Sequence, residues 1–276
     1  MVSVACRITP YTFASATLSN TTVTGRSNGA TNLRQGRRRA LSFLMAQVLW
    51  FELLASASTG LRPRMPYRTW LNSGCVEMTD VMGCENWIME VIGDLATLDA
   101  QRTCLEVNEF EESRKSAERC LLDGIEAMRR QQTRGASALA DSNMRTNGQM
   151  ECSTSKYVSL AFAESALVWC HFLATSPDGL LSAGCEAAVA QAVETLSRAP
   201  ESTPLRGLVW PICIAGSLAS KGQQQLIREV MDRIARQANT SFGNCGPVME
   251  IIKHCWEARV DWRAAMACSS NYVLLI

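Results

Sequence analysis

The chain has 276 residues, of which 47% are hydrophobic and 19% are charged, so it can bury one large or two modest cores and does not have the composition of a disordered protein. Its 27 basic and 26 acidic residues leave a formal net charge of +1, which provides no bulk attraction to nucleic acid. Twelve cysteines are scattered without any C-x-x-C pair. This spacing argues against a zinc site, and we expect buried, reduced thiols.

Residues 1–39 are expected to form a disordered, basic N-terminal tail. They are rich in Ser, Thr and Asn, and the first acidic residue of the chain is Glu52. Arg34 and Arg37–Arg39 form a candidate nuclear-import patch. The same acid-free composition is also typical of a mitochondrial transit peptide. We therefore predict a nuclear protein, with the mitochondrion as the alternative location.

The most apolar run of the chain covers residues 40–57. Its apolar positions cover most of a helical circumference, which predicts a buried helix. A membrane anchor is the alternative, but the run is slightly short for a span and contains Gln47 and Glu52, which are costly in hydrocarbon. We expect no membrane contact. Gly60, Pro63 and Pro66 are expected to end the helix.

Residues 40–276 are predicted to form one helical domain. Two shorter helices are expected within residues 67–99, and a mixed-charge helix within residues 102–132. In the latter, Arg114 is assigned to the solvated face, and several apolar side chains are assigned to the core. Residues 133–153 lack aromatic residues and are predicted to form a flexible loop. The inward-facing set of the mixed-charge helix is Leu105, Val107, Leu121, Leu122, Ile125 and Met128.

The second half of the domain contains further helix signals. Ser153 or Thr154 is expected to cap a helix that runs to about Thr175, and Ser182 to cap a helix over residues 183–198. An apolar segment that is kinked by Pro211 follows. The strongest amphipathic pattern covers residues 222–238, and another stripe follows Pro247. Because no alternating strand series occurs, the predicted class is all-α, an irregular multi-helix bundle of about eight to ten helices.

The sequence indicates no enzyme. His171 and His254 each follow or precede a cysteine, Cys170 and Cys255, and adjacent helical residues point about 100° apart, so neither pair forms a local nucleophile and base. An S-x-x-K match at residues 153–156 lacks its companion motifs. We therefore predict no catalytic, cofactor-binding or metal-binding residues. The alternative is a helical enzyme or ligand-binding protein of a biosynthetic pathway. The tryptophans are assigned to the core, although a few could line an effector pocket.

A resemblance emerges in the last third of the chain. Residues 205–216 read LRGLVWPICIAG and resemble the "L-x-W-P-L-x-x-A-G" segment of the second type of fungal-specific transcription factor domain. The helices over 222–238 and 248–256, and the pair Asp261 and Trp262, follow in the order that is typical of that family. Residues 82–98 and 162–198 are similar to earlier blocks of the same family.

The resemblance implies a helical regulatory region of a fungal zinc-cluster transcription factor, which contacts proteins of the transcription machinery, a DNA-binding partner or a small effector. The binuclear zinc cluster of that family is absent from this sequence, since only Cys6 precedes Cys75. Direct DNA contact is therefore doubtful, and two alternatives follow: the chain is a shortened gene product, or it acts through other proteins. A role in a metabolite gene cluster is a further hypothesis.

Overall fold

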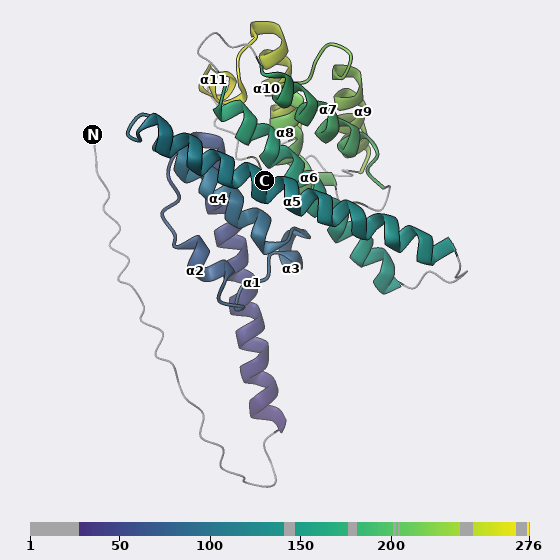
Figure 1. Ribbon diagram of the computed structural model, residues 1–276. Coiled ribbons are helices and arrows are strands. Elements are labelled where there is room, and N and C mark those ends of the chain that lie inside the picture. Colours follow the sequence, from purple (N-terminus) through teal and green to yellow (C-terminus); the bar gives the residue numbers. More distant parts are fainter. Residues whose placement is uncertain are drawn as a thin grey trace. The chain divides into compact units, whose positions relative to one another are not determined.

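The computed structural model describes residues 28–140, 147–175, 181–200, 203, 205–237, 245–268 and 275. Within these ranges the protein has eleven α-helices, one short 3-10 helix and no strand, which confirms the predicted all-α class (Figure 1). The helices are α1 (Asn28–Thr59), α2 (Tyr67–Leu71), α3 (Thr79–Met82), α4 (Asn86–Ala100), α5 (Val107–Ala140), α6 (Asn147–Leu173), α7 (Ala183–Ser197), η1 (Leu205–Leu208), α8 (Val209–Ser217), α9 (Gln224–Gln237), α10 (Cys245–Ala258) and α11 (Trp262–Cys268).

The chain divides into two units, residues 1–38 and residues 39–276. The described part of the first unit is the beginning of α1, where residues 35–38 are exposed. Residues 28–39 are thus helical, although the sequence predicted a disordered tail up to residue 39. Arg, Leu, Gln and Ala favour helix, and they extend the apolar helix towards the N-terminus. The rest of the predicted tail, residues 1–27, lies outside the described residues.

The second unit is built around α6. This helix packs against α4, α5, α7 and α8, and it is buried on all sides from Tyr157 to Cys170. Small residues such as Ala161 and Ala166 let neighbouring helices approach closely, while Phe162 and Trp169 fill the space between them. A helix that is buried around its whole circumference is therefore the centre of the bundle.

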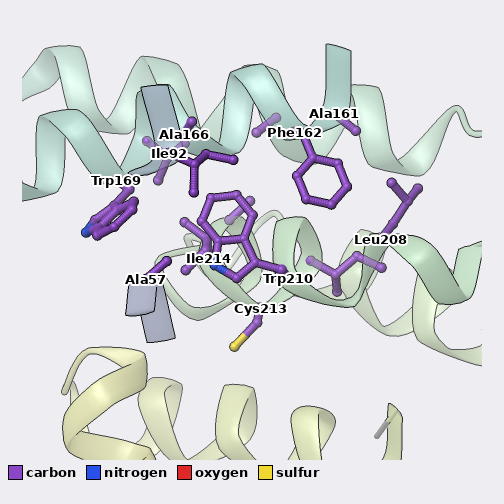
Figure 2. Close-up of a cluster of buried hydrophobic side chains, with 14 of the residues drawn as sticks. Ala57, Ile92, Ala161, Phe162, Ala166, Trp169, Leu208, Trp210, Cys213 and Ile214 are labelled. Atoms are coloured by element: carbon purple, nitrogen blue, oxygen red, sulfur yellow. The ribbon is translucent and has the colours of Figure 1, made fainter. Parts of the chain in front are cut away.

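Aromatic side chains hold the middle of this core together. Phe162 and Trp210 stack with ring centroids 5.7 Å apart, and Trp169 meets Trp210 edge-on at 6.2 Å (Figure 2). Ile92 of α4 and Ala57 of α1 lie in the same cluster (Figure 2). Elements from both halves of the sequence therefore share one core.

The predicted loop over residues 133–153 is largely helical. Helix α5 continues to Ala140 and α6 already begins at Asn147, so neither Ser153 nor Thr154 is the cap of α6. Residues 141–146 lie outside the described part of the chain. The prediction was wrong here because a lack of aromatic residues removes packing partners but does not remove helix propensity, which Ala, Arg and Met supply.

Helix α7 confirms its predicted cap. The Ser182 Oγ accepts a hydrogen bond from the Cys185 backbone N–H at 3.1 Å, as expected for a serine that precedes a helix. Pro211, where the sequence predicted a kink, falls near the start of α8, directly after η1. It lies in the first turn of α8, where a backbone N–H has no helical partner to lose.

Helix α5 differs from its predicted faces in three places. Arg114 is only 7% exposed, and Val107 and Leu122 are exposed, although the sequence pattern assigned each of them to the other side. Arg114 is buried because Glu111 and Glu118 pair with its guanidinium, both at 3.0 Å. Apolar periodicity cannot predict the burial of a charged side chain that forms ion pairs with two carboxylates.

Candidate functional site: a cleft between α2, α4 and α5

The histidine and cysteine pairs that the sequence singled out do not form a reactive site. The Cys170 thiol donates to the Arg114 carbonyl at 3.5 Å, while His171 Nε2 lies 3.6 Å from Glu118 Oε1. Burial raises the pKa of Cys170 to about 12 and lowers the pKa of His171. Burial likewise raises the pKa of Cys255 to about 12. Both cysteines therefore remain thiols, which are poor nucleophiles.

The motif residues of the last third of the chain serve packing. Trp210 lies in the aromatic core, and Trp256 Nε1 donates to the Gly216 carbonyl at 2.8 Å. Asp261 Oδ1 accepts hydrogen bonds from the backbone N–H groups of Arg263 and Ala264 in the first turn of α11, and the adjacent Trp262 is fully buried. These motif residues therefore pack α8 against α10 and begin α11, and they do not form a reactive site.

A cleft of about 1000 Å³ lies between α2, α4 and α5. One wall is the segment between α1 and α2 together with α2 itself, and the other wall is α5. The floor is the apolar face of α4, where Val91, Leu95 and Leu98 lie. A volume of this size accommodates a small organic molecule or a short peptide segment.

The polar centre of the cleft is Asp94 on α4. The Tyr67 hydroxyl donates to Asp94 Oδ1 at 2.7 Å, and Arg68 Nε donates to the same oxygen at 2.8 Å. Burial, together with the hydrogen bond to Asp94, raises the pKa of Tyr67 to about 12. The phenol therefore stays protonated and holds α2 against α4. The side chains of Arg62, Ser113 and Ser116 also line the cleft.

Two glycines set how closely each wall of the cleft approaches its floor, α4. A Cβ on Gly93 would lie 2.6 Å from the Tyr67 ring, and a Cβ on Gly124 would lie 2.3 Å from the ring of Trp87. The indole Nε1 of Trp87 donates to Glu85 at 2.7 Å. Each aromatic ring therefore rests directly on helix backbone, which only glycine permits at these positions.

The cleft contains binding groups but no evident catalytic pair. Its cysteine, Cys120, has a pKa that is raised, first by burial and then by nearby carboxylates including Asp94, so it is a weak nucleophile. Among the residues that the structure describes, no group of three or more His, Cys, Asp or Glu could hold a metal ion. The absence of catalytic and metal-binding residues from the whole chain stays a prediction.

Sequence reasoning did not locate this cleft. One signal was available, namely single glycines inside two otherwise regular helices, at Gly93 and Gly124, which often mark a close approach. Trp87 lines the cleft, and the alternative that a few tryptophans line an effector pocket stays a prediction. Trp169, Trp210 and Trp262 instead lie in the core.

Comparison with known proteins identifies a set of relatives. The chain is 28% identical to the trichothecene biosynthesis transcription regulator TRI10 of Trichoderma arundinaceum over 225 residues, which is 80% of this chain and 49% of the relative. It is 27% identical to the transcription factor dibT of Pestalotiopsis microspora, over 83% of this chain and 40% of that protein. The chain is 23% identical to the transcription factor phomR of Diaporthe leptostromiformis, over 91% of this chain and 47% of that protein.

The chain thus spans about half the length of the curated relatives it matches. No solved structure matches it. Residues 19–276 match the family described as the fungal specific transcription factor domain, and this range includes all described helices and both walls of the cleft. The chain belongs to the fungal-specific transcription factor domain family.

Proposed function

We propose that this chain is the helical regulatory and interaction module of a fungal transcription regulator that controls genes for the biosynthesis of a metabolite. The observation that carries the proposal is the match of residues 19–276 to the family. The relatives support the pathway class, since one of them is named as a regulator of trichothecene biosynthesis. The cleft supports a binding role, because it offers apolar surface and hydrogen-bonding groups.

In this proposal the module acts by binding and not by chemistry. A small effector or a segment of a partner protein occupies the cleft, and contact with DNA is made through other proteins. The net charge of +1 favours indirect contact with DNA, because DNA-binding surfaces are strongly basic. We further propose that the protein works in the nucleus and that Arg37–Arg39 contribute to import.

Deletion of the gene followed by transcript profiling tests the proposal. We expect a coordinated fall in the transcripts of a set of genes, together with loss of their metabolite. The second candidate function, a helical enzyme or ligand carrier of the same pathway, predicts an unchanged transcriptome and the loss of one metabolite. Imaging of the tagged full chain tests the location, and accumulation in mitochondria instead of nuclei would contradict the proposal.

Filling the cleft tests its part in the function. Ser116 is an exposed residue of the α5 wall, so Ser116→Trp should occupy the cleft without disturbing the core. We expect the target transcripts to fall towards the level of the deletion strain, while the thermal midpoint is unchanged. Lys115→Trp is the matched control, because Lys115 is exposed on the same helix but does not line the cleft. Equal transcript levels in the wild type, the Ser116→Trp strain and the Lys115→Trp strain would exclude the cleft as a binding site.

A further inference from the structure

Two arginines in the segment before α2 bring unpaired positive charge to the cleft. Arg62 and Arg64 both line the cleft and are exposed. In the part of the chain that the structure describes, neither guanidinium forms an ion pair or a hydrogen bond. Glu52 lies close to Arg64, but its carboxylate accepts a hydrogen bond from the Arg64 backbone N–H at 2.6 Å. Both guanidinium groups are therefore available to a ligand.

The backbone of this segment holds the two arginines in place. Pro63 lies between them and is buried, while Arg62 and Arg64 are exposed, so both side chains leave the segment on the side away from the core. Pro63 and Pro66 restrict the backbone, and the hydrogen bond from Arg64 to Glu52 ties the segment to α1. Because the segment is already ordered, a ligand that binds to it loses less free energy in ordering the protein.

The carboxylates of the cleft favour a ligand with a single negative charge. Arg68 already pairs with Asp94 at 2.7 Å and lies 3.9 Å from Glu90. Glu109, on the α5 wall, forms no ion pair with any described residue. A phosphate monoester, or a peptide segment with several acidic residues, would be repelled by these carboxylates. A monoanion is repelled less and still pairs with Arg62 and Arg64.

The rest of the lining fits an apolar skeleton that carries oxygen atoms. Val91, Leu95 and Leu98 form the apolar floor on α4. Ser113 and Ser116 line the α5 wall and are exposed, and neither hydroxyl has a hydrogen-bond partner within the described ranges. A hydroxyl both donates and accepts, so these serines can bind the carbonyl or hydroxyl groups of a ligand.

We propose that the cleft binds a monocarboxylic organic acid whose skeleton carries hydroxyl or carbonyl groups. Its carboxylate pairs with Arg62 and Arg64, its apolar part lies on the α4 floor, and its oxygen atoms contact Ser113 and Ser116. The proposal names the occupant of the cleft and therefore rests on the binding role proposed above.

Titration calorimetry of the purified full chain with a small acid tests the charge of the ligand. The probe is 6-hydroxy-2-naphthoate, which combines a carboxylate, a hydroxyl and a flat apolar body, and its Kd should be about 0.1–1 mM, as expected for a fragment of this size. The corresponding naphthamide has no charge and should bind about tenfold more weakly. Naphthyl phosphate, which is largely a dianion at neutral pH, should also bind more weakly than the naphthoate.

The decisive variant is Arg62→Gln with Arg64→Gln, which should weaken binding of the naphthoate about tenfold. Lys115→Gln with Arg119→Gln is the matched control, because it removes two exposed positive charges that do not line the cleft, and its Kd should equal that of the wild type. Glu109→Gln should tighten binding about twofold or more, because it removes a like charge from the cleft. A gain of affinity cannot arise from a loss of folding.

Four results overturn the proposal: no binding of the naphthoate at about 10 mM, equal affinity for its amide, tighter binding of naphthyl phosphate, or an unchanged Kd in the Arg62→Gln/Arg64→Gln variant. The binding role of the cleft is tested separately, by the transcripts of the Ser116→Trp strain. Reduced transcripts in that strain, together with no binding of the naphthoate, would overturn the acid but leave the binding role standing, and a segment of a partner protein would then be the occupant.

Discussion

Gly93 shows how a single missing side chain shapes the cleft. The Tyr67 ring lies 2.6 Å from where a Cβ at residue 93 would be, and from there its hydroxyl donates to Asp94. The conformational cost of a glycine inside a helix is thereby offset by an aromatic contact and a hydrogen bond. The sequence displays the glycine, but its partner is 26 residues away and in another helix.

Substitution of Gly93 should therefore change the free energy of unfolding in a direction that depends on whether Tyr67 is present. Gly93→Ala displaces the ring and is expected to lower the free energy of unfolding by about 1–3 kcal/mol. In a Tyr67→Ser background the same change should raise it by about 0.5–1 kcal/mol, because alanine favours helix. Urea denaturation of the four proteins measures both effects. A loss of equal size in both backgrounds would show that the ring is not the obstacle.

Glu164 is a buried acid in the central helix. It is 2% exposed and accepts a hydrogen bond from Arg129 Nη2 at 2.6 Å. Burial is the largest effect and raises the pKa of Glu164 above its usual range, even though Arg129 acts in the opposite direction. Protonation of Glu164 is therefore easier in the folded protein than in the unfolded chain.

This raised pKa predicts how stability changes with pH. The protonated Glu164 side chain contributes fully to the free energy of unfolding below the unfolded-state pKa of about 4.3. This contribution is lost as the pH rises through the higher pKa of the folded state. Glu164→Gln imitates the protonated acid, so its stability relative to the wild type should increase between about pH 5 and about pH 7. Denaturation at both pH values tests this. Glu126→Gln is the control, since Glu126 is 61% exposed, and a similar trend there would contradict the assignment.

At the scale of single elements, the capping serine of α7 provides a direct test. Ser182→Ala removes the acceptor for the Cys185 N–H and should cost about 1 kcal/mol of stability. Ser182→Asp should restore most of it, because a carboxylate accepts the same bond and interacts favourably with the helix N-terminus. Thermal denaturation distinguishes the three proteins. An alanine variant as stable as the wild type would mean that α7 does not depend on its cap.

Sequence patterns predicted the elements unevenly. The ranges of α7 and α9, and the all-α class, followed from caps and apolar periodicity, because both signals are local. The first turns of α1, the end of α5 and the start of α6 were missed, since weakly apolar residues such as Ala136 and Ala138 still form helix. The cleft could not be predicted, because its walls are contributed by α2, α4 and α5, and their approach depends on tertiary contacts.

At the scale of the whole molecule, one ion pair connects regions that are far apart in the sequence. Arg263 of α11 pairs with Asp99 at the end of α4, where the Asp99 side chain is only 6% exposed. The guanidinium also lies over Trp169 and Trp262, with 5.6 Å and 5.2 Å between its carbon and the ring centroids. This contact ties the last described helix to the first half of the bundle.

Removal of Arg263 alone should lower the free energy of unfolding more than removal of both Arg263 and Asp99. Arg263→Met leaves Asp99 buried without a counter-charge and should cost about 3 kcal/mol. The double variant Asp99→Leu/Arg263→Met should recover most of this loss, because a buried pair replaced by apolar residues is often neutral. The coupling energy from denaturation of the single and double variants measures the interaction. Additive losses would show that the two residues act separately.

The position of Ala57 among Ile92, Trp210 and Ile214 (Figure 2) has a consequence for synthesis on the ribosome. Helix α1 leaves the exit tunnel early, but its core partners in α8 are translated some 150 residues later, which takes on the order of ten seconds or more at cellular elongation rates. Throughout that interval the part of α1 that packs against α8 is open to solvent. Nascent chains of this protein should therefore recruit chaperones that hold extended apolar segments, and chains arrested before α8 should aggregate.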